Sequence, residues 1–474
     1  MMGNTIFHKW IRVGNRLLLS FSSALFFLVL MGTTVSYSQS GENNRWQAGT
    51  AKAIITPEKP MWLAGYGHRD KPSQGTYHDL WAKVLVMEDQ RGNKGVLVTS
   101  DILGFPQKMS ERIRTKLYQN HGVTKAQVIL NSTHTHSGPV LEEALYDIYP
   151  LDPEQLNLVS EYSNFLEQKI IELVGQAMQN MKPVRLYAAN GVSRFQVNRR
   201  NNAEREVHQK TALEGPIDHA VPVIKVENEE GGLETILFGY ACHPTVLDHY
   251  YWSGDYPGYA QLELEKYHPG VTAMFFQGAA GDQNPIPRRS VPLAKQYGRT
   301  LAAAVDRVLE EEMAPLPATF RLVYREIDLA LESAPSEEEL SEMAQQESGY
   351  MQRWAKRILA FTQSGGTSLT SYPYPLQIWQ IGSQLLFNMG GEVTVAYANR
   401  LKADYGHDIF VMAYSNDVMG YIPSEIILKE GGYEGYSSQM VYGLPAKWKP
   451  GLEKQILETF DEMAAELSIS KVYE

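Results

Sequence analysis

Residues 127–139 read QVILNSTHTHSGP and join a short apolar run to a histidine pair and a Ser-Gly-Pro turn. The run at 127–130 predicts a buried strand, because it is short, apolar and bounded by turn-forming residues. In an extended chain His134 and His136 point to the same side, since side chains alternate with a period of two. Two imidazoles on one side of a strand end favour a metal site, whereas a single histidine is more often structural.

Further apolar runs of the same kind predict strands, and stretches with helical spacing of apolar residues predict helices. The predicted strands are residues 95–100, 221–226, 236–241, 271–276, 385–389 and 409–413. The predicted helices are residues 108–120, 158–181, 294–312, 336–361, 394–405 and 452–467. Strands that alternate with long helices indicate an α/β protein with mixed β-sheets layered with helices. No repeat or low-complexity linker marks a boundary, so we expect one compact domain over residues 39–474.

The first 38 residues have the pattern of a secretory signal peptide. Residues 9–16 carry three basic side chains, the uncharged run 17–31 follows, and Ser-Tyr-Ser at 36–38 offers a cleavage site. The apolar run has 15 residues, fewer than the about 20 of a membrane span. No cysteine lies near the cleavage site, which excludes a lipoprotein anchor. We therefore expect an exported protein, periplasmic or secreted, without a transmembrane span after cleavage.

The composition is that of an ordinary globular protein with an acidic balance. Its 474 residues include 43 Lys and Arg against 54 Asp and Glu, a net charge of −11. This balance argues against nucleic-acid binding, which needs a basic face. The single cysteine, Cys242, excludes an intrachain disulfide, and this usage fits a bacterial periplasm better than a disulfide-stapled scaffold. Because Cys242 precedes His243 on a predicted strand, we expect it to point the other way as a small buried hydrophobe.

Other candidate ligands also follow predicted strands. His243 lies in FGYACHPT at 238–245, and Asp248 and His249 close behind it are alternatives. Glu392 lies in LFNMGGEVT at 386–394, where it is either a metal-binding carboxylate or a carboxylate stabilised by the dipole of the next helix. Two tyrosines occupy glycine turns, where packing is the usual role; they are Tyr421 and Tyr433.

Taken in order, these motifs resemble the catalytic domain of the neutral/alkaline, non-lysosomal ceramidases. The resemblance covers nearly all of the chain after residue 38, and HTHSGP at 134–139 is its most specific element. The other matching elements are AGTA at 48–51, ITP at 55–57, GY at 65–66, VNR at 197–199, residues 218–226, DYPGYA at 255–260, GGE at 390–392, GY at 420–421 and YEG at 433–435. The resemblance implies the ceramidase catalytic-domain fold, one Zn²⁺ per chain and hydrolysis of an N-acyl amide bond.

Matched position by position, the resemblance implies four zinc ligands, which are His134, His243, Glu392 and Tyr421. It also implies that His136, Arg199 and Tyr433 surround the metal-activated water and the substrate carbonyl. Zinc lowers the pKa of such a water towards about 7 and polarises a carbonyl, while Arg199 and Tyr433 can donate to an oxyanion. Asp101, at another predicted strand end, is either a carboxylate that orients a histidine or a strand-end cap.

The chain departs from the family pattern in two ways. GDQNP at 281–285 stands where the family has a motif with a serine, proposed as nucleophile or substrate-positioning hydroxyl, and the serine position is Asn284. An amide cannot be a nucleophile, so either the zinc-activated water attacks directly, with Asp282 positioning water, or the chemistry differs. The family's ceramidases carry a further C-terminal immunoglobulin-like domain, whereas this chain stops after the 452–467 helix. We expect substrate contacts from Asn284, Asp255 and Tyr259.

Three functions remain open. The first is an exported zinc hydrolase that cleaves an N-acyl amide bond of a ceramide-like lipid, with Trp62, Leu63, Leu141 and 250–252 lining an apolar groove. The second is a hydrolase of the same fold that acts on a carbohydrate or another polar amide or ester. Its sugar-stacking surfaces would be residues 250–256 and 433–442, and Asn284 would read a hydroxyl. The third is a non-catalytic binding protein, against which the complete set of ligand-type residues argues. The resemblance keeps the first in front.

Overall fold

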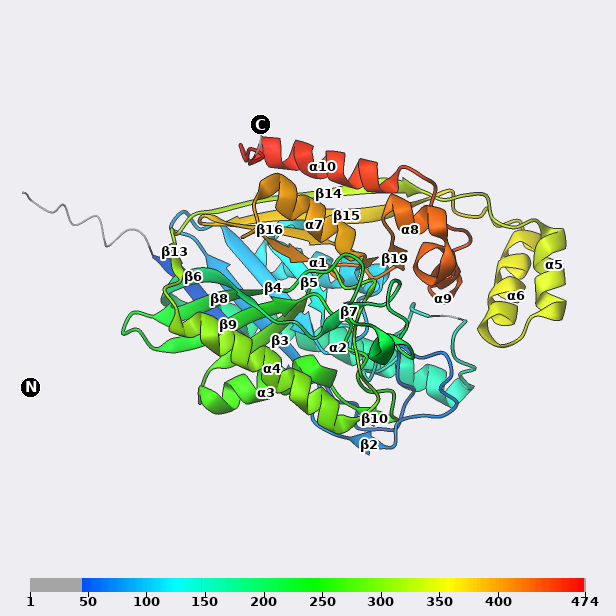
Figure 1. Cartoon of the computed structure of the whole chain (residues 1–474), viewed down its shortest axis with the longest axis horizontal. Helices are drawn as coiled ribbons and strands as arrows, with labels where there is room; N and C mark the ends of the chain where they lie inside the picture. Colours follow the sequence, from blue (N-terminus) through cyan, green and yellow to red (C-terminus); the bar gives the residue numbers. More distant parts are fainter. Residues whose placement is uncertain (1–44, 146, 473–474) are drawn as a thin grey trace, which may run out of the picture. The chain divides into compact units, whose positions relative to one another are not determined.

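The computed structural model describes residues 45–145 and 147–472. These residues form an α/β structure of layered sheets and helices (Figure 1), as the sequence predicts. The predicted signal peptide lies outside the described residues. Among the described helices, none combines the length and the apolar character that crossing a bilayer requires.

The largest sheet has nine strands and is mixed. Its path runs β11-β9-β8-β6-β1-β3-β4-β5, with β13 paired to β6. The central pairs are antiparallel, while the pairs β4–β5 and β9–β11 at the two edges are parallel. The strands are β1 Trp46–Ile54, β3 Trp81–Glu88, β4 Lys94–Ser100, β5 Val128–Ser132, β6 Lys182–Val192, β8 Ala220–Asn228, β9 Leu233–Tyr240, β11 Thr272–Gln277 and β13 Ala314–Leu316.

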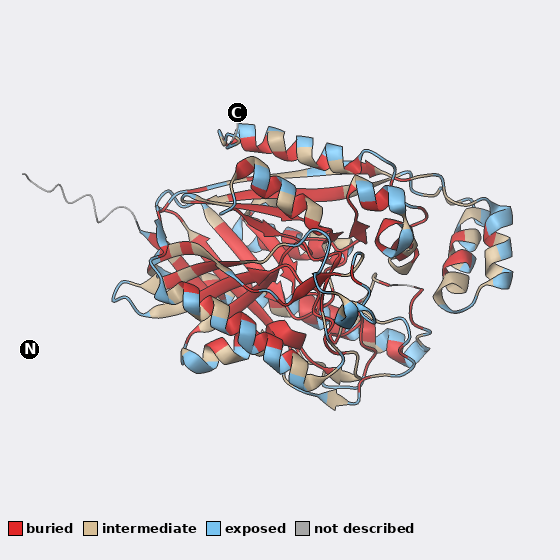
Figure 2. Ribbon diagram, in the orientation of Figure 1, coloured by how far each residue is buried: buried red, intermediate tan, exposed pale blue. Residues whose placement is uncertain are grey.

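Both faces of this sheet are buried, which explains its continuous apolar runs. In β4, Val96 and Val98 pack among helices, whereas Leu97 between them joins a cluster with Trp379 and Phe410 of a second sheet. Figure 2 shows the buried strands between more exposed helices. The helices on the outer face are α1 Gln107–His121, α2 Pro153–Gln179, α3 Asp255–Tyr267 and α4 Val291–Glu310.

The second sheet has the order β14-β15-β16-β18. Side chains on its other face, such as Ile378 and Phe387, pack with Leu401 and Phe460 of two covering helices. The layers are therefore helix, sheet, sheet and helix. The members are β14 Phe320–Ala330, β15 Ser371–Ile381, β16 Gln384–Met389, β18 Phe410–Met412, α7 Val395–Tyr405 and α10 Leu452–Glu466.

The single helix predicted over residues 336–361 is wrong. Two helices, α5 Glu337–Gln346 and α6 Gly349–Gln363, form a hairpin that lies at the right of Figure 1. Apolar spacing continues across the break, but Gly349 has a φ of 61°, a left-handed conformation that interrupts a helix and suits glycine.

Short elements connect the layers and carry most of the candidate site. Two ribbons matter below: antiparallel β7–β12, and parallel β17–β19. The short elements are β2 Gly75–Thr76, β7 Gln196–Asn198, β10 Tyr251–Trp252, β12 Gln283–Pro285, β17 Glu392–Val393, β19 Tyr421–Ile422, α8 Glu425–Glu430, a π-helical turn Tyr433–Ser437, α9 Ser438–Val441, and 3₁₀ turns Lys125–Gln127 and Val207–Gln209.

Candidate metal centre

Three histidines from two distant segments meet in a buried cluster. One ring nitrogen from each of His134, His136 and His243 lies within 4.8 Å of the others. The two segments follow β5 and β9, which are separated in the sheet order, but the sheet's edges approach each other. The Gln277 amide of β11 donates to Asn131 Oδ1 of β5 at 3.0 Å. This approach of the two edge strands brings the histidines together.

The histidine pair converges for a different reason from the one that the strand period predicts. β5 ends at Ser132, and His134 has a φ of 61°, so the chain is not extended there. The two Nε2 atoms of His134 and His136 are nevertheless 3.2 Å apart. A local turn, and not strand alternation, therefore points both rings to one place.

The ring orientations define which nitrogen is free. His134 Nδ1 lies 2.6 Å from the Leu103 carbonyl, and His243 Nδ1 lies 2.6 Å from the Ala280 carbonyl. A carbonyl oxygen only accepts, so each Nδ1 carries a proton, and in a neutral ring Nε2 then offers a lone pair. Burial, followed by the Arg199 charge, lowers the pKa of His243 to about 4, so its ring is neutral at pH 7.

Glu392 faces these lone pairs with another acceptor. Its Oε2 lies 2.8 Å from His243 Nε2 and 3.2 Å from His134 Nε2. Burial by itself raises the pKa of this carboxyl, but the two histidines outweigh burial and hold the pKa well below its usual range. With each Nδ1 turned to a backbone carbonyl, the two Nε2 atoms and the carboxylate oxygen converge on one point that a cation can occupy. The donor set therefore fits a bound divalent metal ion.

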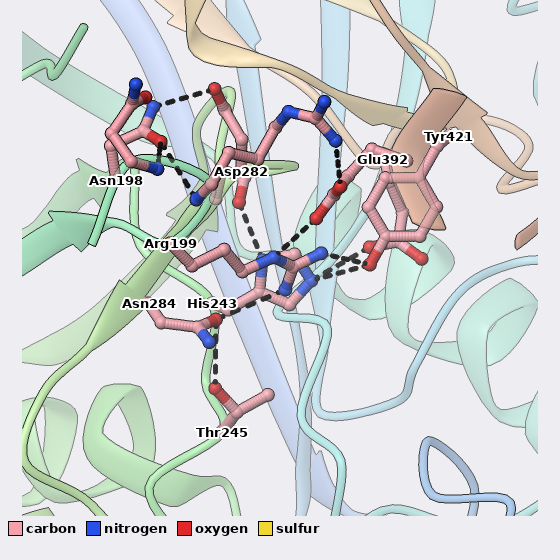
Figure 3. Close-up of polar contacts among 12 residues, drawn as sticks. Asn198, Arg199, His243, Thr245, Asp282, Asn284, Glu392 and Tyr421 are labelled. Carbon is pink, nitrogen blue, oxygen red and sulfur yellow. Dashed lines mark hydrogen bonds and ion pairs between the residues drawn. The ribbon is translucent and has the colours of Figure 1, made fainter. Parts of the chain in front are cut away.

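Tyr421 completes the set of four residues expected as ligands. The parallel pairing of β17 with β19 sets it opposite Glu392. Its hydroxyl lies 3.3 Å from His243 Nε2 and accepts a hydrogen bond from Arg199 Nη2 at 3.0 Å (Figure 3). Burial raises the pKa of Tyr421 well above its ordinary value, and the Arg199 charge opposes this effect. The guanidinium therefore favours the phenolate form that a metal ligand needs.

Arg199 joins several parts of the site. Its Nε donates to Glu434 at 2.8 Å and its Nη1 donates to Asn284 at 3.2 Å, in addition to the bond to Tyr421. Tyr433 lies beside this group with its ring 5.4 Å from that of Tyr421, and it is 44 % exposed. Arg199 is thus a fixed part of the centre, while Tyr433 is accessible.

His136 lies at the same centre but differs from the other two histidines. Its Nδ1 is buried, and no described residue forms a hydrogen bond with it. Burial first, and then His134 and His243, lower its pKa well below the ordinary value. The edge of the Tyr66 ring packs against it at 4.9 Å between centroids. The neutral ring can accept a proton at the centre.

Two site residues escaped prediction. Tyr442 donates from its hydroxyl to Glu392 Oε1 at 2.5 Å, so it holds the second oxygen of the carboxylate. Glu434 also bonds Arg200 Nη1 at 2.7 Å and thereby anchors the turn that carries Tyr433. Both belong to the aromatic segment 433–442, but no spacing rule in the sequence points to either role.

Asp282 is part of the framework of the site. Its Oδ1 accepts from the Val395 amide at 2.8 Å, at the start of α7. Its Oδ2 accepts from Asn198 Nδ2 at 3.0 Å, and Figure 3 shows both of these side chains. Helix starts favour a carboxylate in this position. Both oxygens are used by the protein, so the contacts do not favour the predicted water-positioning role.

Several other predicted residues lie elsewhere. The Asp255 carboxylate accepts from the Leu247 and Tyr256 amides at 2.8 and 2.6 Å and is fully buried, which leaves it no access to a substrate. Asp101 accepts from the Trp81 amide and from Thr133, which is the strand-end alternative. The remaining predicted side chains pair outside the cluster: Asp248 with Arg289, His249 with Tyr77, and Tyr259 with His78.

The predicted apolar groove is not open at its expected residues. Trp62 and Leu63 are buried in the core, as is Cys242, which fits the expectation of a small hydrophobe. Leu141 lines an apolar cavity of about 20 Å³ together with Leu103 and Tyr442. This recess touches the centre through two residues that contact its ligands.

Comparison with known proteins gives a consistent family. A family model described as "Neutral/alkaline non-lysosomal ceramidase, N-terminal" matches residues 46–288. Neutral ceramidase A of Dictyostelium discoideum is 26 % identical over 270 residues, which are 52 % of this chain and 37 % of that protein. The neutral ceramidase of Pseudomonas aeruginosa is 25 % identical over 332 residues, 64 % of this chain and 48 % of that protein.

The chain thus spans less than half the length of these curated relatives. The crystal structure of neutral ceramidase from Pseudomonas aeruginosa superposes with a TM-score of 0.70 at 20 % identity, covering 90 % of this chain and 75 % of that one. That superposition establishes a shared fold. With a family match over half of its length, the chain belongs to the neutral/alkaline non-lysosomal ceramidase family.

Proposed function

We propose that this chain is an exported zinc-dependent hydrolase that cleaves an N-acyl amide bond, with a ceramide-like lipid as the leading substrate. The observation that carries the proposal is the convergence of His134 Nε2, His243 Nε2 and Glu392 Oε2, with each histidine Nδ1 turned to a backbone carbonyl. The names of the two relatives given above, both neutral ceramidases, support the amide-hydrolase class.

The ligands are His134, His243, Glu392 and Tyr421, a nitrogen and oxygen set that suits Zn²⁺. When bound, zinc supplies a Lewis acid that lowers the pKa of water and polarises a carbonyl. The Leu103 and Ala280 carbonyls fix the two imidazoles, and Tyr442 fixes the carboxylate. Such outer contacts keep ligands in place and set their basicity.

The side chains around the ligands have three further roles, which are proton transfer, stabilisation of negative charge and support of the site. His136 is neutral at pH 7 and accepts a proton at Nε2, the atom that faces the centre. Arg199 holds Tyr421, and Tyr433, an exposed residue, donates from its hydroxyl to the substrate carbonyl as negative charge develops there. A residue of the predicted catalytic group, Asp282, acts by holding the α7 start and Asn198.

A second candidate is a hydrolase of the same fold acting on a carbohydrate or another polar amide or ester. The observation that favours it is the small apolar cavity beside the centre, together with the burial of Trp62 and Leu63 in the core. Long-chain N-acyl sphingosine, N-acetylated sugars and acetylated sugars, assayed side by side, separate the two candidates. Turnover of the sphingosine amide alone supports the lipid function, and turnover of the sugars alone supports the second.

Metal analysis tests the shared part of both candidates. The purified wild type should hold about one zinc per chain, and His243→Ala should hold none. His249→Ala is the matched control, because His249 pairs with Tyr77 outside the cluster and should leave the metal content unchanged. Glu392→Ala should abolish turnover. A folded wild type without bound metal, or full turnover by Glu392→Ala, would contradict the zinc mechanism.

A further inference from the structure

The amide of Asn284 has one defined orientation. Asn284 lies on β12 opposite Val197 of β7, two residues before Arg199. Its Oδ1 accepts from Arg199 Nη1 at 3.2 Å and from Thr245 Oγ1 at 3.4 Å (Figure 3). A guanidinium has no acceptor, so the atom that faces it must be the amide oxygen. The NH₂ group of Asn284 is therefore the end left for other contacts.

This NH₂ group has no partner within the described part of the protein. No described residue accepts from Asn284 Nδ2, although the side chain is only 4 % exposed. Some described polar atoms are both buried and without a hydrogen-bond partner, and Asn284 Nδ2 is not one of them. The small exposure of the residue thus includes its donor group. The donor group is thus partly accessible, on the same amide whose oxygen bonds Arg199.

Arg199 sets the distance between this donor and the metal centre. Arg199 Nη1 donates to Asn284 Oδ1, and Arg199 Nη2 donates to the Tyr421 hydroxyl at 3.0 Å. The Tyr421 hydroxyl in turn lies 3.3 Å from His243 Nε2. Asn284 is consequently joined to the ligands through one rigid, planar group. Its free end can only donate, whereas a serine hydroxyl both donates and accepts.

We propose that Asn284 Nδ2 donates a hydrogen bond to the carbonyl oxygen of the scissile acyl group. This assignment rests on the proposed hydrolase function and deepens it, because it names the substrate atom that the residue reads. It also replaces the expectation that Asn284 reads a hydroxyl. A fixed neutral donor at this position stabilises the negative charge that develops on the acyl oxygen.

Asn284→Asp is the sharpest test, because a carboxylate keeps the acceptor for Arg199 and Thr245 and replaces the neutral donor with a charged acceptor. We expect unchanged metal content, an unchanged melting temperature and a loss of about 100-fold in kcat, the usual effect of removing one such donor. Asn284→Ala should lose a similar factor. Asn180→Asp makes the same chemical change at an exposed site at the end of α2 and should retain full activity. Wild-type kcat in either Asn284 variant would overturn the assignment.

A binding measurement keeps this test separate from the proposed function. Calorimetric titration of the metal-loaded protein with decanoate probes the acyl oxygens without turnover. Wild type should bind, and Asn284→Asp should bind about tenfold more weakly, because two carboxylates then face each other. That result with no hydrolysis of any amide would refute the hydrolase function and support the acyl-oxygen contact. Equal decanoate binding by both proteins, or no binding by either, would overturn the proposed contact between Asn284 and the acyl oxygen.

Discussion

Replacing Tyr442 with phenylalanine should weaken metal binding while leaving every predicted ligand in place. The Tyr442 hydroxyl donates to Glu392 Oε1 at 2.5 Å; Glu392 is buried and Tyr442 is partly buried. A hydrogen bond to a charged group contributes about 1.5–3 kcal/mol, and removal of such an outer contact usually costs about 10–100-fold in metal affinity. The two ranges agree, because about 1.4 kcal/mol corresponds to a factor of ten. We therefore expect the zinc dissociation constant to rise by about 10–100-fold.

Competition with a chromogenic chelator at pH 7.5 measures this constant directly. Tyr162→Phe is the matched control, since Tyr162 also donates from a buried hydroxyl, to the Ile55 carbonyl at 2.6 Å, but packs in the cluster around α1 and α2. Both variants should lose stability, and only Tyr442→Phe should lose metal affinity. Equal zinc affinity in Tyr442→Phe and the wild type would refute the view that this hydroxyl holds the Glu392 carboxylate in place.

Three further predictions follow from contacts and charges. Arg199→Lys keeps the positive charge but loses the set of three hydrogen bonds to Glu434, Asn284 and Tyr421. We expect kcat to fall by about 100-fold in a steady-state assay. A kcat near that of the wild type would contradict the positioning role of Arg199. Burial raises the pKa of Asp417 to about 7, so the folded state binds this proton more tightly than the unfolded state. In urea titrations, the free energy of unfolding should therefore fall by up to about 4 kcal/mol as the pH rises from 4 to 7. Asp417→Asn should not show this pH dependence. A chelator should lower the melting temperature of the wild type but not that of His243→Ala, which is expected to hold no metal. Equal shifts in both proteins would argue against a link between metal binding and stability.

The sequence predicts strands best where both faces are buried. The run 236–241 became β9 and the run 95–100 became β4, because an unbroken apolar stretch of this length fits a strand between two layers. β3 was missed because Lys83 interrupts its apolar pattern. That lysine is buried only because Nζ meets Glu265 at 2.9 Å and the Ala273 carbonyl at 2.7 Å, partners that are remote in sequence.

Some site residues could likewise be predicted from the sequence, and others could not. His134 and His136 could be singled out because they are close in sequence, although the turn that unites them was not foreseen. The positions matched to His243, Glu392 and Tyr421 needed a family resemblance, since their meeting depends on the approach of the two edge strands and on the β17–β19 pairing. Tyr442 could not be predicted at all, because a tyrosine in an aromatic segment gives no sign of its partner.

The approach of the two sheet edges has a consequence for the order of events during maturation. The Asn131 side chain accepts from Gln277 and donates to the Ala413 carbonyl, so three remote segments must be docked before the histidine rings face Glu392. Long-range pairings of this kind form late in folding, because chain closure is costly before many contacts exist. Metal uptake should therefore be one of the last steps. A chain arrested before the 392–421 region docks would hold histidines but no assembled centre, and holding a metal would mark chains that have finished folding.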